Sequence, residues 1–230
     1  MIQLENVSKR YLVKKALNNV NLQIEPGHII GLIGSNGSGK STTLKLIAGL
    51  IRPSKGTVLV EGKLANRRIC AKVAYLSELD AYYSFFTVEQ TVDFYARTFS
   101  DFNREKAEEI LQFMKLDRAQ KVKDLSKGSR ARLKIVVTLA RDVPFILMDE
   151  PLSGLDPMVR QSIIRGLLSF IDLERQTIIL TTHELAEIEP LLDTVILLKD
   201  GTVVATERIE SIRDKEKLNL VDWMVKNYEQ

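Results

Sequence analysis

The sequence predicts an α/β fold in which helices flank a mostly parallel sheet. Two short runs, Ile29–Ile33 and residues 145–148, are apolar almost throughout, which is typical of strands buried on both faces of a sheet. A helical pattern follows each run, and a third strand pattern at Thr177–Thr181 comes after the second helix. Buried strands that alternate with helices favour parallel pairing.

The composition is ordinary for a soluble globular domain, with 45% hydrophobic and 27% charged residues. The 33 basic and 30 acidic side chains nearly cancel, so bulk charge gives no reason to expect nucleic acid as a partner. Cys70 is the only cysteine, which excludes an intrachain disulfide, and we expect its thiol to be reduced and half-buried. Because no run of about 18 apolar residues is present, we expect any membrane role to act through a partner.

Strand patterns dominate the N-terminal quarter. Residues 2–5 and 20–24 alternate between apolar and polar side chains, which predicts half-buried antiparallel strands. Between them, residues 9–15 predict a hairpin-like excursion that carries Tyr11. A further strand is expected at residues 57–60. This part of the chain is therefore predicted to form an antiparallel β-subdomain.

The middle of the chain has a different pattern, which predicts a helical subdomain inserted into the α/β core. Thr87 and Gln90 have the spacing of a capping box at the start of its first helix. Further helices are expected at residues 104–114, where an apolar stripe lies opposite charged side chains, and at residues 128–141.

The last third returns to alternating helices and strands, with a helix expected at residues 157–171. Strands at 194–198 and 202–205 are joined through Asp200 and Gly201, which favours a hairpin. Trp223 is expected to dock a polar helical tail onto the core. The chain therefore divides into a core formed by residues 1–84 and 142–206, a helical subdomain at 85–141 and a tail at 207–230.

A phosphate-binding loop is predicted between the strand Ile29–Ile33 and a helix at residues 41–48. Residues 34–41 fit the pattern G-x-x-x-x-G-K-[ST]. Glycine lets the backbone turn its amide groups toward an anion, and the helix N-terminus adds positive potential. Lys40 can reach the terminal phosphates of ATP, and the Ser41 hydroxyl can hold magnesium. The alternative is a glycine-rich turn before a helix with no ligand.

Two carboxylates, Asp149 and Glu150, follow the apolar run at residues 145–148. In a parallel sheet this places them beside the phosphate loop. Asp149 suits magnesium, and Glu150 suits the positioning and polarising of an attacking water. An acidic pair after a strand is a weak signal by itself, but with the phosphate loop it predicts ATP hydrolysis.

At these positions the sequence resembles the ATP-binding subunits of ATP-binding-cassette (ABC) transporters, over residues 1–210. The resemblance implies a P-loop NTPase core of ABC type, with ATP and Mg²⁺ as cofactors. It implies Glu150 and His183 as catalytic residues and assigns Ser41, Asp149 and Glu78 to the magnesium ion. Nucleotide binding is assigned to Tyr11, Gly34, Ser35, Asn36, Gly37, Ser38, Gly39, Lys40, Ser41, Thr42, Ser126, Gly128 and Asp156.

The sequence departs from the family pattern in two places. The signature segment, LSGGQ in the family, reads LSKGS here, with Lys127 and Ser129 at the changed positions and Ser126 and Gly128 retained. The glutamine of the Q-loop is replaced by Glu78. A carboxylate there can still bind magnesium or orient water. With this substitution the sequence resembles the ATPases of ABC-2-type exporters from Gram-positive bacteria.

The resemblance also implies partners. ATP would be sandwiched between two ATP-binding subunits, as a homodimer or a heterodimer, with Lys40 of one subunit and Ser126 of the other on the same nucleotide. A polytopic membrane permease would dock near Glu78 and residues 82–86, although these aromatics could equally be subdomain core. The chain would then be cytoplasmic and peripheral on the inner face of the membrane.

Two other functions are compatible with an ABC ATPase sequence. One is a soluble ATPase with a non-transport role, such as iron–sulfur assembly. The other is a nucleotide-dependent scaffold without catalysis, which is disfavoured because Glu150 and His183 are both present.

Overall fold

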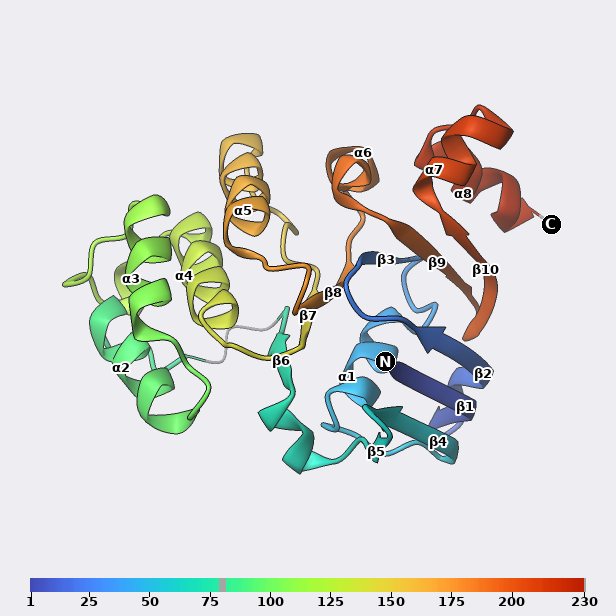
Figure 1. Cartoon of the computed structure of the whole chain (residues 1–230), viewed down its shortest axis with the longest axis horizontal. Coiled ribbons are helices and arrows are strands. Elements are labelled where there is room, and N and C mark those ends of the chain that lie inside the picture. Colours follow the sequence, from blue (N-terminus) through green and yellow to red (C-terminus); the bar gives the residue numbers. More distant parts are fainter. Residues whose placement is uncertain (79–81, 230) are drawn as a thin grey trace.

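The central sheet has six strands within residues 1–78 and 82–229, the part of the chain that the computed structural model describes (Figure 1). Five strands run parallel and the edge strand β10 is antiparallel to β9. In spatial order the strands are β10 (Thr202–Arg208), β9 (Thr194–Lys199), β3 (Ile29–Ile33), β8 (Thr177–Thr181), β7 (Phe145–Asp149) and β6 (Val73–Leu76). The predicted α/β fold with a mostly parallel sheet is confirmed.

The central strands supply two hydrophobic cores from their opposite faces. Every residue of β3, β7 and β8 is buried, as the apolar runs predict. Along β3, Ile30 and Leu32 belong to one core cluster, whereas Ile29 and Ile33 belong to the other. This alternation follows from the two-residue period of a strand. The carboxyl ends of the parallel strands meet at one edge of the sheet, where the loops that follow them lie close together.

A second sheet is antiparallel and has the order β2-β1-β4-β5. Strands β1 (Ile2–Tyr11) and β2 (Lys14–Ile24) form one long hairpin, which extends beyond the predicted strands and pairs Tyr11 with Lys14. Strands β4 (Lys55–Val60) and β5 (Lys63–Leu64) complete the sheet. Its apolar face shares a core with α1 (Lys40–Ile47) and one face of the central sheet.

The segment between the two sheets was not foreseen in the sequence. A 3₁₀ helix at Arg67–Ala71 leads into β6, which pairs in parallel with β7 at the edge of the central sheet. The expectation that Cys70 is half-buried was wrong, because this short helix buries Ile69 and leaves Cys70 exposed.

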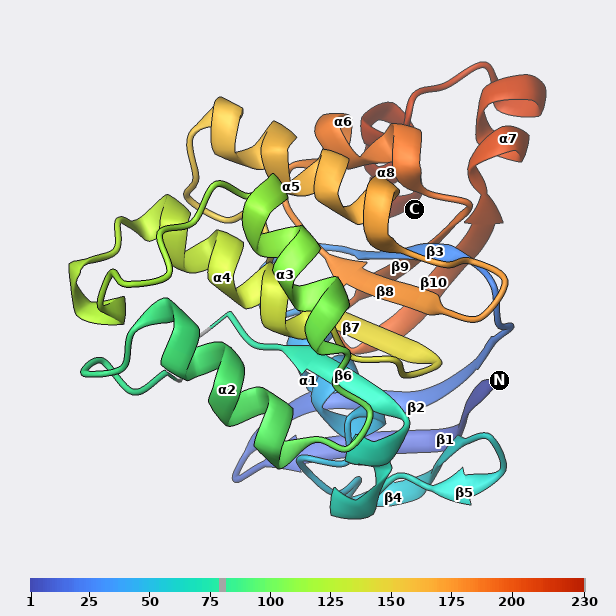
Figure 2. The ribbon, with the colours of Figure 1, turned by 60° about the vertical axis from the view of Figure 1, so that its left-hand side comes forward.

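Helices α2 (Val88–Thr98), α3 (Arg104–Phe113) and α4 (Lys127–Leu139) lie together at one side of the molecule (Figure 2). The capping box at Thr87 and Gln90 is present, with both reciprocal hydrogen bonds. Helix α5 (Pro157–Phe170) packs beside α4, and the short helix α6 (Leu185–Ile188) follows β8. The helices predicted from the sequence are confirmed to within a few residues.

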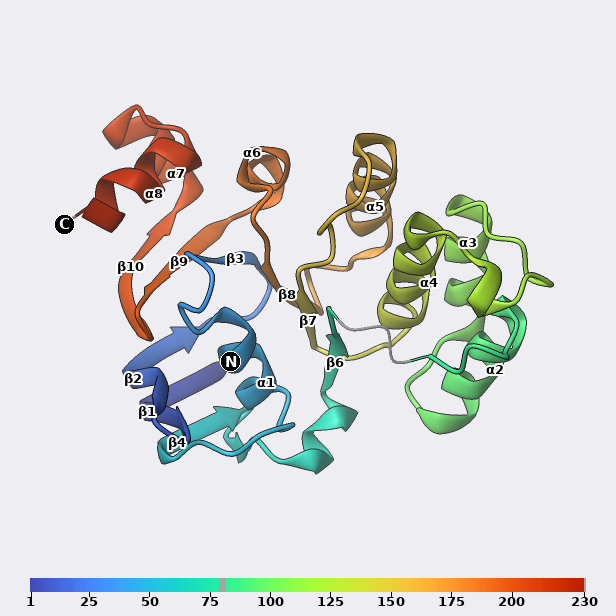
Figure 3. The same ribbon diagram turned by 180° about the vertical axis from the view of Figure 1, so that it is seen from behind.

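The C-terminal tail lies at the opposite end of the molecule from α2 and α3 (Figure 3). It comprises α7 (Ile209–Ser211), a π-helical turn (Ile212–Glu216) and α8 (Leu220–Glu229), while residues 207 and 208 extend β10. Trp223 is 2% exposed and belongs to the main core, which confirms that it docks the tail. No helix in the described part of the chain is long and apolar enough to cross a membrane.

The capping box at the start of α2 gives a first prediction. Replacing Thr87 with alanine removes the acceptor for the Gln90 N–H and should lower the free energy of unfolding by about 1 kcal/mol. Urea unfolding monitored by circular dichroism measures this change. Thr87→Ser keeps the hydroxyl and is the control. Equal stability of the alanine and serine variants would contradict the capping role.

Candidate functional site

The loop after β3 can be built only with glycine at its turning points. Gly34 has φ 148° and Gly39 has φ 111°, values that residues with a side chain rarely adopt. A Cβ atom on Gly34 would lie 2.1 Å from the Leu198 carbonyl oxygen, and one on Gly39 would lie 2.8 Å from the Ala16 carbonyl oxygen. The loop is therefore packed closely against β2 and β9.

The N-terminus of α1 faces this loop without a side-chain cap, because its N-cap residue is Gly39. The backbone N–H groups of the first helical turn have no partners within the helix and are oriented to bind an anion. Among the described residues, the buried Ser38 hydroxyl also makes no hydrogen bond. These donors fit the phosphate groups of a nucleotide.

Lys40 opens α1 and is only 6% exposed. Its Nζ atom donates hydrogen bonds to the carbonyl oxygens of Gly34 at 2.8 Å and Ser35 at 3.1 Å. Burial lowers the pKa of the ammonium, whereas the nearby carboxylates of Glu150 and Asp149 act in the opposite direction. The ammonium is thus held among loop carbonyls that a phosphate could replace.

The buried carboxylate of Asp149 gathers hydroxyl groups from three elements. Ser41 of α1 donates to Oδ1 at 2.8 Å, and Thr181 of β8 donates to the same oxygen at 3.1 Å. Tyr75 of β6 donates to Oδ2 at 3.0 Å. Burial and the Asp149 charge together raise the pKa of Tyr75, which keeps the phenol protonated as a donor. The prediction that Ser41 and Asp149 lie together agrees with this geometry.

Glu150 follows β7 in the left-handed region of backbone space, at φ 51°. Its N–H donates to the Thr181 hydroxyl at 2.9 Å, which holds this conformation. His183, just beyond the end of β8, places Nε2 3.1 Å from Glu150 Oε1. Burial raises the pKa of Glu150, while His183 and Lys40 pull it down. Glu150 and His183 thus come from the ends of adjacent parallel strands.

These groups surround one open cavity of about 460 Å³. Its lining includes the predicted residues Tyr11, Asn36, Gly37, Gly39, Lys40, Ser41, Thr42, Glu78, Glu150 and His183. Lys14, Ala16 and Ser153 also line it, and they were not among the predicted site residues. Lys14 could have been found from its position, because it pairs with Tyr11 across the predicted hairpin.

The donor set fits a magnesium ion bound together with a nucleotide. Ser41 and Asp149 provide oxygen atoms, the ligands that Mg²⁺ prefers, and Glu78 lines the same cavity. Within the described residues, no group of three or more His, Cys, Asp or Glu could hold a metal ion by itself. The ion would therefore need phosphate oxygens as further ligands.

Residues 17–153 match the ABC transporter family, which covers more than half of the chain. The protein belongs to this family. The uncharacterized ABC transporter ATP-binding protein MJ1023 of Methanocaldococcus jannaschii is 34% identical over 92% of this chain and 79% of its own. The Nod factor export ATP-binding protein I of Cupriavidus metallidurans is 33% identical over 94% of this chain and 74% of its own. The osmoprotectant import ATP-binding protein OsmV of Salmonella typhimurium is 32% identical over 89% of this chain and 58% of its own.

Solved structures agree with this assignment. The structure of an ATP-binding subunit of an ABC transporter superposes with a TM-score of 0.86 at 25% identity, over the whole of both chains. The dimeric, post-hydrolysis structure of the cassette MJ0796 bound to ADP and Pi has a TM-score of 0.81 at 27% identity, over 91% of this chain and 99% of its own. The chain is an ATP-binding ABC ATPase.

Of the predicted nucleotide-binding residues, Gly34, Ser35 and Ser38 belong to the phosphate loop without lining the cavity. Three others of the ATPase, Ser126, Gly128 and Asp156, lie outside the cavity at the starts of α4 and α5. Ser126 caps α4 by accepting the Ser129 N–H at 3.0 Å, and Asp156 caps α5 by accepting the Val159 N–H at 3.0 Å. A Cβ atom on Gly128 would lie 2.9 Å from a Val159 methyl group. The structure therefore does not bring them to the phosphate loop of their own chain.

Lys127, the substituted signature residue, does approach the site of its own subunit. A neighbouring cavity of about 280 Å³ is lined by Lys127, Lys134, Glu78 and Glu150, among others. A Cβ atom on Gly154 would lie only 2.1 Å from Lys127 Nζ, so the ammonium sits directly against that loop. Lys127 thus connects the signature helix of the ATPase with the loop after Glu150.

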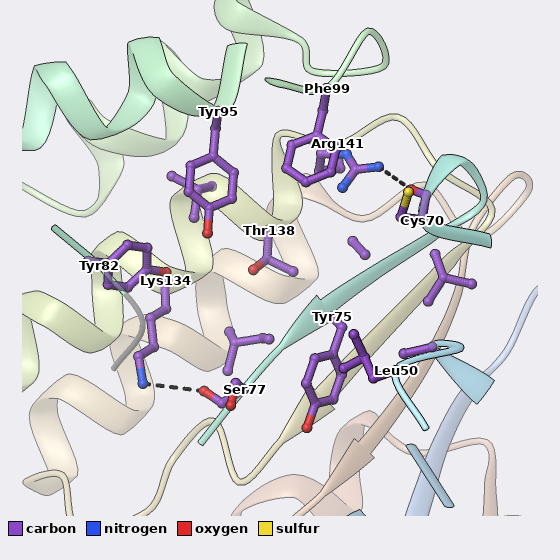
Figure 4. Close-up of a pocket in the computed structure, with 15 residues that line it drawn as sticks. Leu50, Cys70, Tyr75, Ser77, Tyr82, Tyr95, Phe99, Lys134, Thr138 and Arg141 are labelled. Atoms are coloured by element: carbon purple, nitrogen blue, oxygen red, sulfur yellow. Dashed lines mark hydrogen bonds between the residues drawn. The ribbon is translucent and has the colours of Figure 1, made fainter. Parts of the chain in front are cut away.

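A third cavity of the ATPase, of about 220 Å³, lies between β6, α2 and α4 (Figure 4). Tyr75, Tyr82, Tyr95 and Phe99 contribute its aromatic side chains. On one side, Lys134 donates to the carbonyl oxygens of Ser77 at 3.3 Å and Glu78 at 2.9 Å. On the other, Arg141 donates to the Cys70 carbonyl oxygen at 2.6 Å. These bonds join the helical side of the ATPase to the central sheet.

The Thr181 hydroxyl gives a second prediction, because it donates to Asp149 and accepts from the Glu150 N–H. Thr181→Val keeps the shape of the side chain and leaves the Glu150 N–H without its partner, while Asp149 Oδ1 keeps only the hydrogen bond from Ser41. The free energy of unfolding should fall by about 1–3 kcal/mol, measured by urea denaturation. Thr181→Ser keeps the hydroxyl and should lose less. The role of this bond is refuted if the valine variant is as stable as the serine variant.

Proposed function

We propose that this ATPase is the ATP-binding subunit of an ABC exporter and hydrolyses Mg-ATP to drive a separate membrane permease. One observation carries the proposal. The phosphate loop, the Ser41–Asp149 pair and the Glu150–His183 pair all converge at one edge of the parallel sheet. The Glu78 substitution and the similarity to a Nod factor export protein support export, whereas the similarity to OsmV makes import the alternative.

In this proposal the phosphate loop binds the nucleotide. Lys40 exchanges its bonds to the Gly34 and Ser35 carbonyl oxygens for bonds to phosphate oxygens. The amide groups at the start of α1, extending to Thr42, surround the phosphates. Tyr11, at the end of β1, is 44% exposed at the cavity and offers its ring to the adenine.

Ser41, Asp149 and Glu78 are the residues that would hold the magnesium ion. When bound, the ion neutralises part of the negative charge of the phosphates. Tyr75 and Thr181 hold the Asp149 carboxylate in a fixed position next to Ser41, which lines the cavity. Tyr75 is thus a positioning residue that the sequence did not reveal.

Glu150 orients the attacking water and accepts its proton at a carboxylate oxygen. The nearby positive charge of Lys40 favours the ionised form that this step requires, against the effect of burial. His183 Nε2 holds Oε1 of the same carboxylate, so the second oxygen remains available to the water. His183 is 47% exposed at its side chain and can also reach the terminal phosphate.

A second ATP-binding subunit completes each site. Ser126 and Asp156 are exposed at helix starts and do not line the cavity at their own phosphate loop. We assign Ser126, Gly128 and Asp156 to the nucleotide bound by the partner subunit, as a homodimer or a heterodimer. Support comes from the dimeric structure of the cassette MJ0796.

The permease docks at the cavity between β6, α2 and α4. Next to it, Tyr83 is 50% and Phe85 is 65% exposed, and their rings lie 5.6 Å apart. Tyr82 and Phe86 are half-buried, so the aromatic segment is partly core and partly surface. An amphipathic helix of the permease would cover the exposed rings. The ATPase would thus be peripheral on the cytoplasmic face of the membrane.

A third prediction tests the hydrolytic site. Glu150→Gln preserves the shape of the side chain and removes the proton acceptor, so turnover should fall at least about 100-fold while Mg-ATP still binds. An ATP-bound dimer should accumulate, measured by light scattering at saturating Mg-ATP. Glu109→Gln, an exposed substitution on α3, is the control. A Glu150→Gln variant that stays monomeric would refute the sandwiched dimer.

A fourth prediction tests the permease. A photo-crosslinking amino acid in place of Phe85 should capture a polytopic membrane protein in membranes of the native host. The same group in place of Leu64, which is 62% exposed on β5, should not. Capture of soluble proteins alone would favour the alternative of a soluble ABC ATPase with a non-transport role.

A further inference from the structure

The tail helix α8 is firmly attached beside α6. Leu220 is fully buried, and Trp223 lies with it in the main core. Glu189, at the end of α6, accepts the Leu220 N–H at 3.0 Å and pairs with Arg213 at 3.0 Å. Trp223 Nε1 also donates to Glu216 at 3.1 Å. Apolar packing and charged hydrogen bonds therefore fix the course of α8 from its first turn.

The other end of α8 reaches the phosphate loop. The hydroxyl of Tyr228 shares a hydrogen bond with the Ser35 hydroxyl, and it accepts the Ser35 N–H at 3.3 Å. Lys199, at the end of β9, donates to the Tyr228 carbonyl oxygen at 2.5 Å, and its ammonium lies 5.3 Å from the ring centre. Lys199 places a positive charge at the C-terminus of α8, where the helix dipole favours it.

Ser35 is therefore held from two directions. Lys40 donates to its carbonyl oxygen at 3.1 Å, and Tyr228 bonds its hydroxyl and its N–H. When Lys40 turns to phosphate, the first bond is lost and the bonds to Tyr228 remain. Without Tyr228, the start of the loop would be free to change conformation at that moment. The conformational entropy lost when nucleotide binding orders the loop again would reduce the affinity for nucleotide.

We propose that Tyr228 is a positioning residue for nucleotide binding, which holds the phosphate loop through Ser35. The inference rests on the proposed role of the phosphate loop and adds the C-terminal helix to the site. Because α8 also packs on α6, which begins two residues after His183, the tail contacts both the phosphate loop and the helix that follows His183. A partner or a modification that moves α8 would thereby alter nucleotide affinity.

Tyr228→Phe removes only the hydroxyl and gives the fifth prediction. The substitution removes both hydrogen bonds to Ser35, and calorimetric titration with Mg-ADP should show about 3- to 10-fold weaker binding, the size of effect expected when such bonds are lost. The KM for ATP should rise by a similar factor, while kcat at saturating ATP stays within about twofold. Thermal unfolding without nucleotide should stay close to that of the unchanged protein. Val225→Ala, an exposed substitution on α8, is the control and should bind normally.

Three results would overturn the proposal: unchanged Mg-ADP affinity in Tyr228→Phe, an equal loss in Val225→Ala, or a fall in kcat with an unchanged KM. A double-mutant cycle with Ser35→Ala should show coupling between the two side chains, and additive effects would also count against it. The variant Lys40→Ala distinguishes a failure of the phosphate-loop assignment from a failure of the proposed role of Tyr228. If that variant binds Mg-ADP normally, the phosphate-loop assignment fails. If only Lys40→Ala loses affinity, the role of Tyr228 alone fails.

Discussion

The hydrogen-bonded carboxylate of Asp149 is the interaction on which the rest of the site depends. A buried carboxylate is costly unless its oxygen atoms find donors. Here the donors come from α1, β6 and β8, so satisfying one charge also fixes the relative positions of three elements. Glu150 follows Asp149 at the end of β7, and His183 comes just after β8, so the arrangement around Asp149 also positions these two residues. The parallel order β8-β7-β6 supplies the strand ends that make it possible.

The charges of the site are balanced for a ligand that carries negative charge. Burial works against the charged forms of both Lys40 and Glu150, as the directions of their pKa shifts show. A bound polyphosphate would stabilise the ammonium of Lys40 and repel the carboxylate of Glu150. The two groups therefore respond in opposite ways to the same ligand. The ligand would thus raise the pKa of both groups, which favours the charged form of Lys40 and the neutral form of Glu150.

Local patterns in the sequence predict most of the fold and half of the site. The apolar strands, the capping box and the phosphate loop each involve residues close in the chain, so their spacing carries the information. Strand β6 was missed because it is short and lies at a sheet edge. The contacts Tyr75–Asp149 and Ser35–Tyr228 link residues 74 and 193 positions apart, and no local pattern records such pairs. The division into core, helical subdomain and tail remains a prediction.

The close packing of Gly128 against Val159 affects how substitutions in the signature segment are interpreted. Any larger residue at position 128 must displace the Val159 side chain or push α4 away from α5, because a Cβ atom there would lie 2.9 Å from a valine methyl group. Loss of activity in such a variant would then mix two causes, a displaced helix and a missing contact to the partner's nucleotide. Ser126 likewise has two roles in this proposal, since its hydroxyl caps α4 and is assigned to the partner's nucleotide. In the proposed dimer, folding and recognition of the partner's nucleotide would depend on the same atoms of this segment, which narrows the substitutions that evolution can accept.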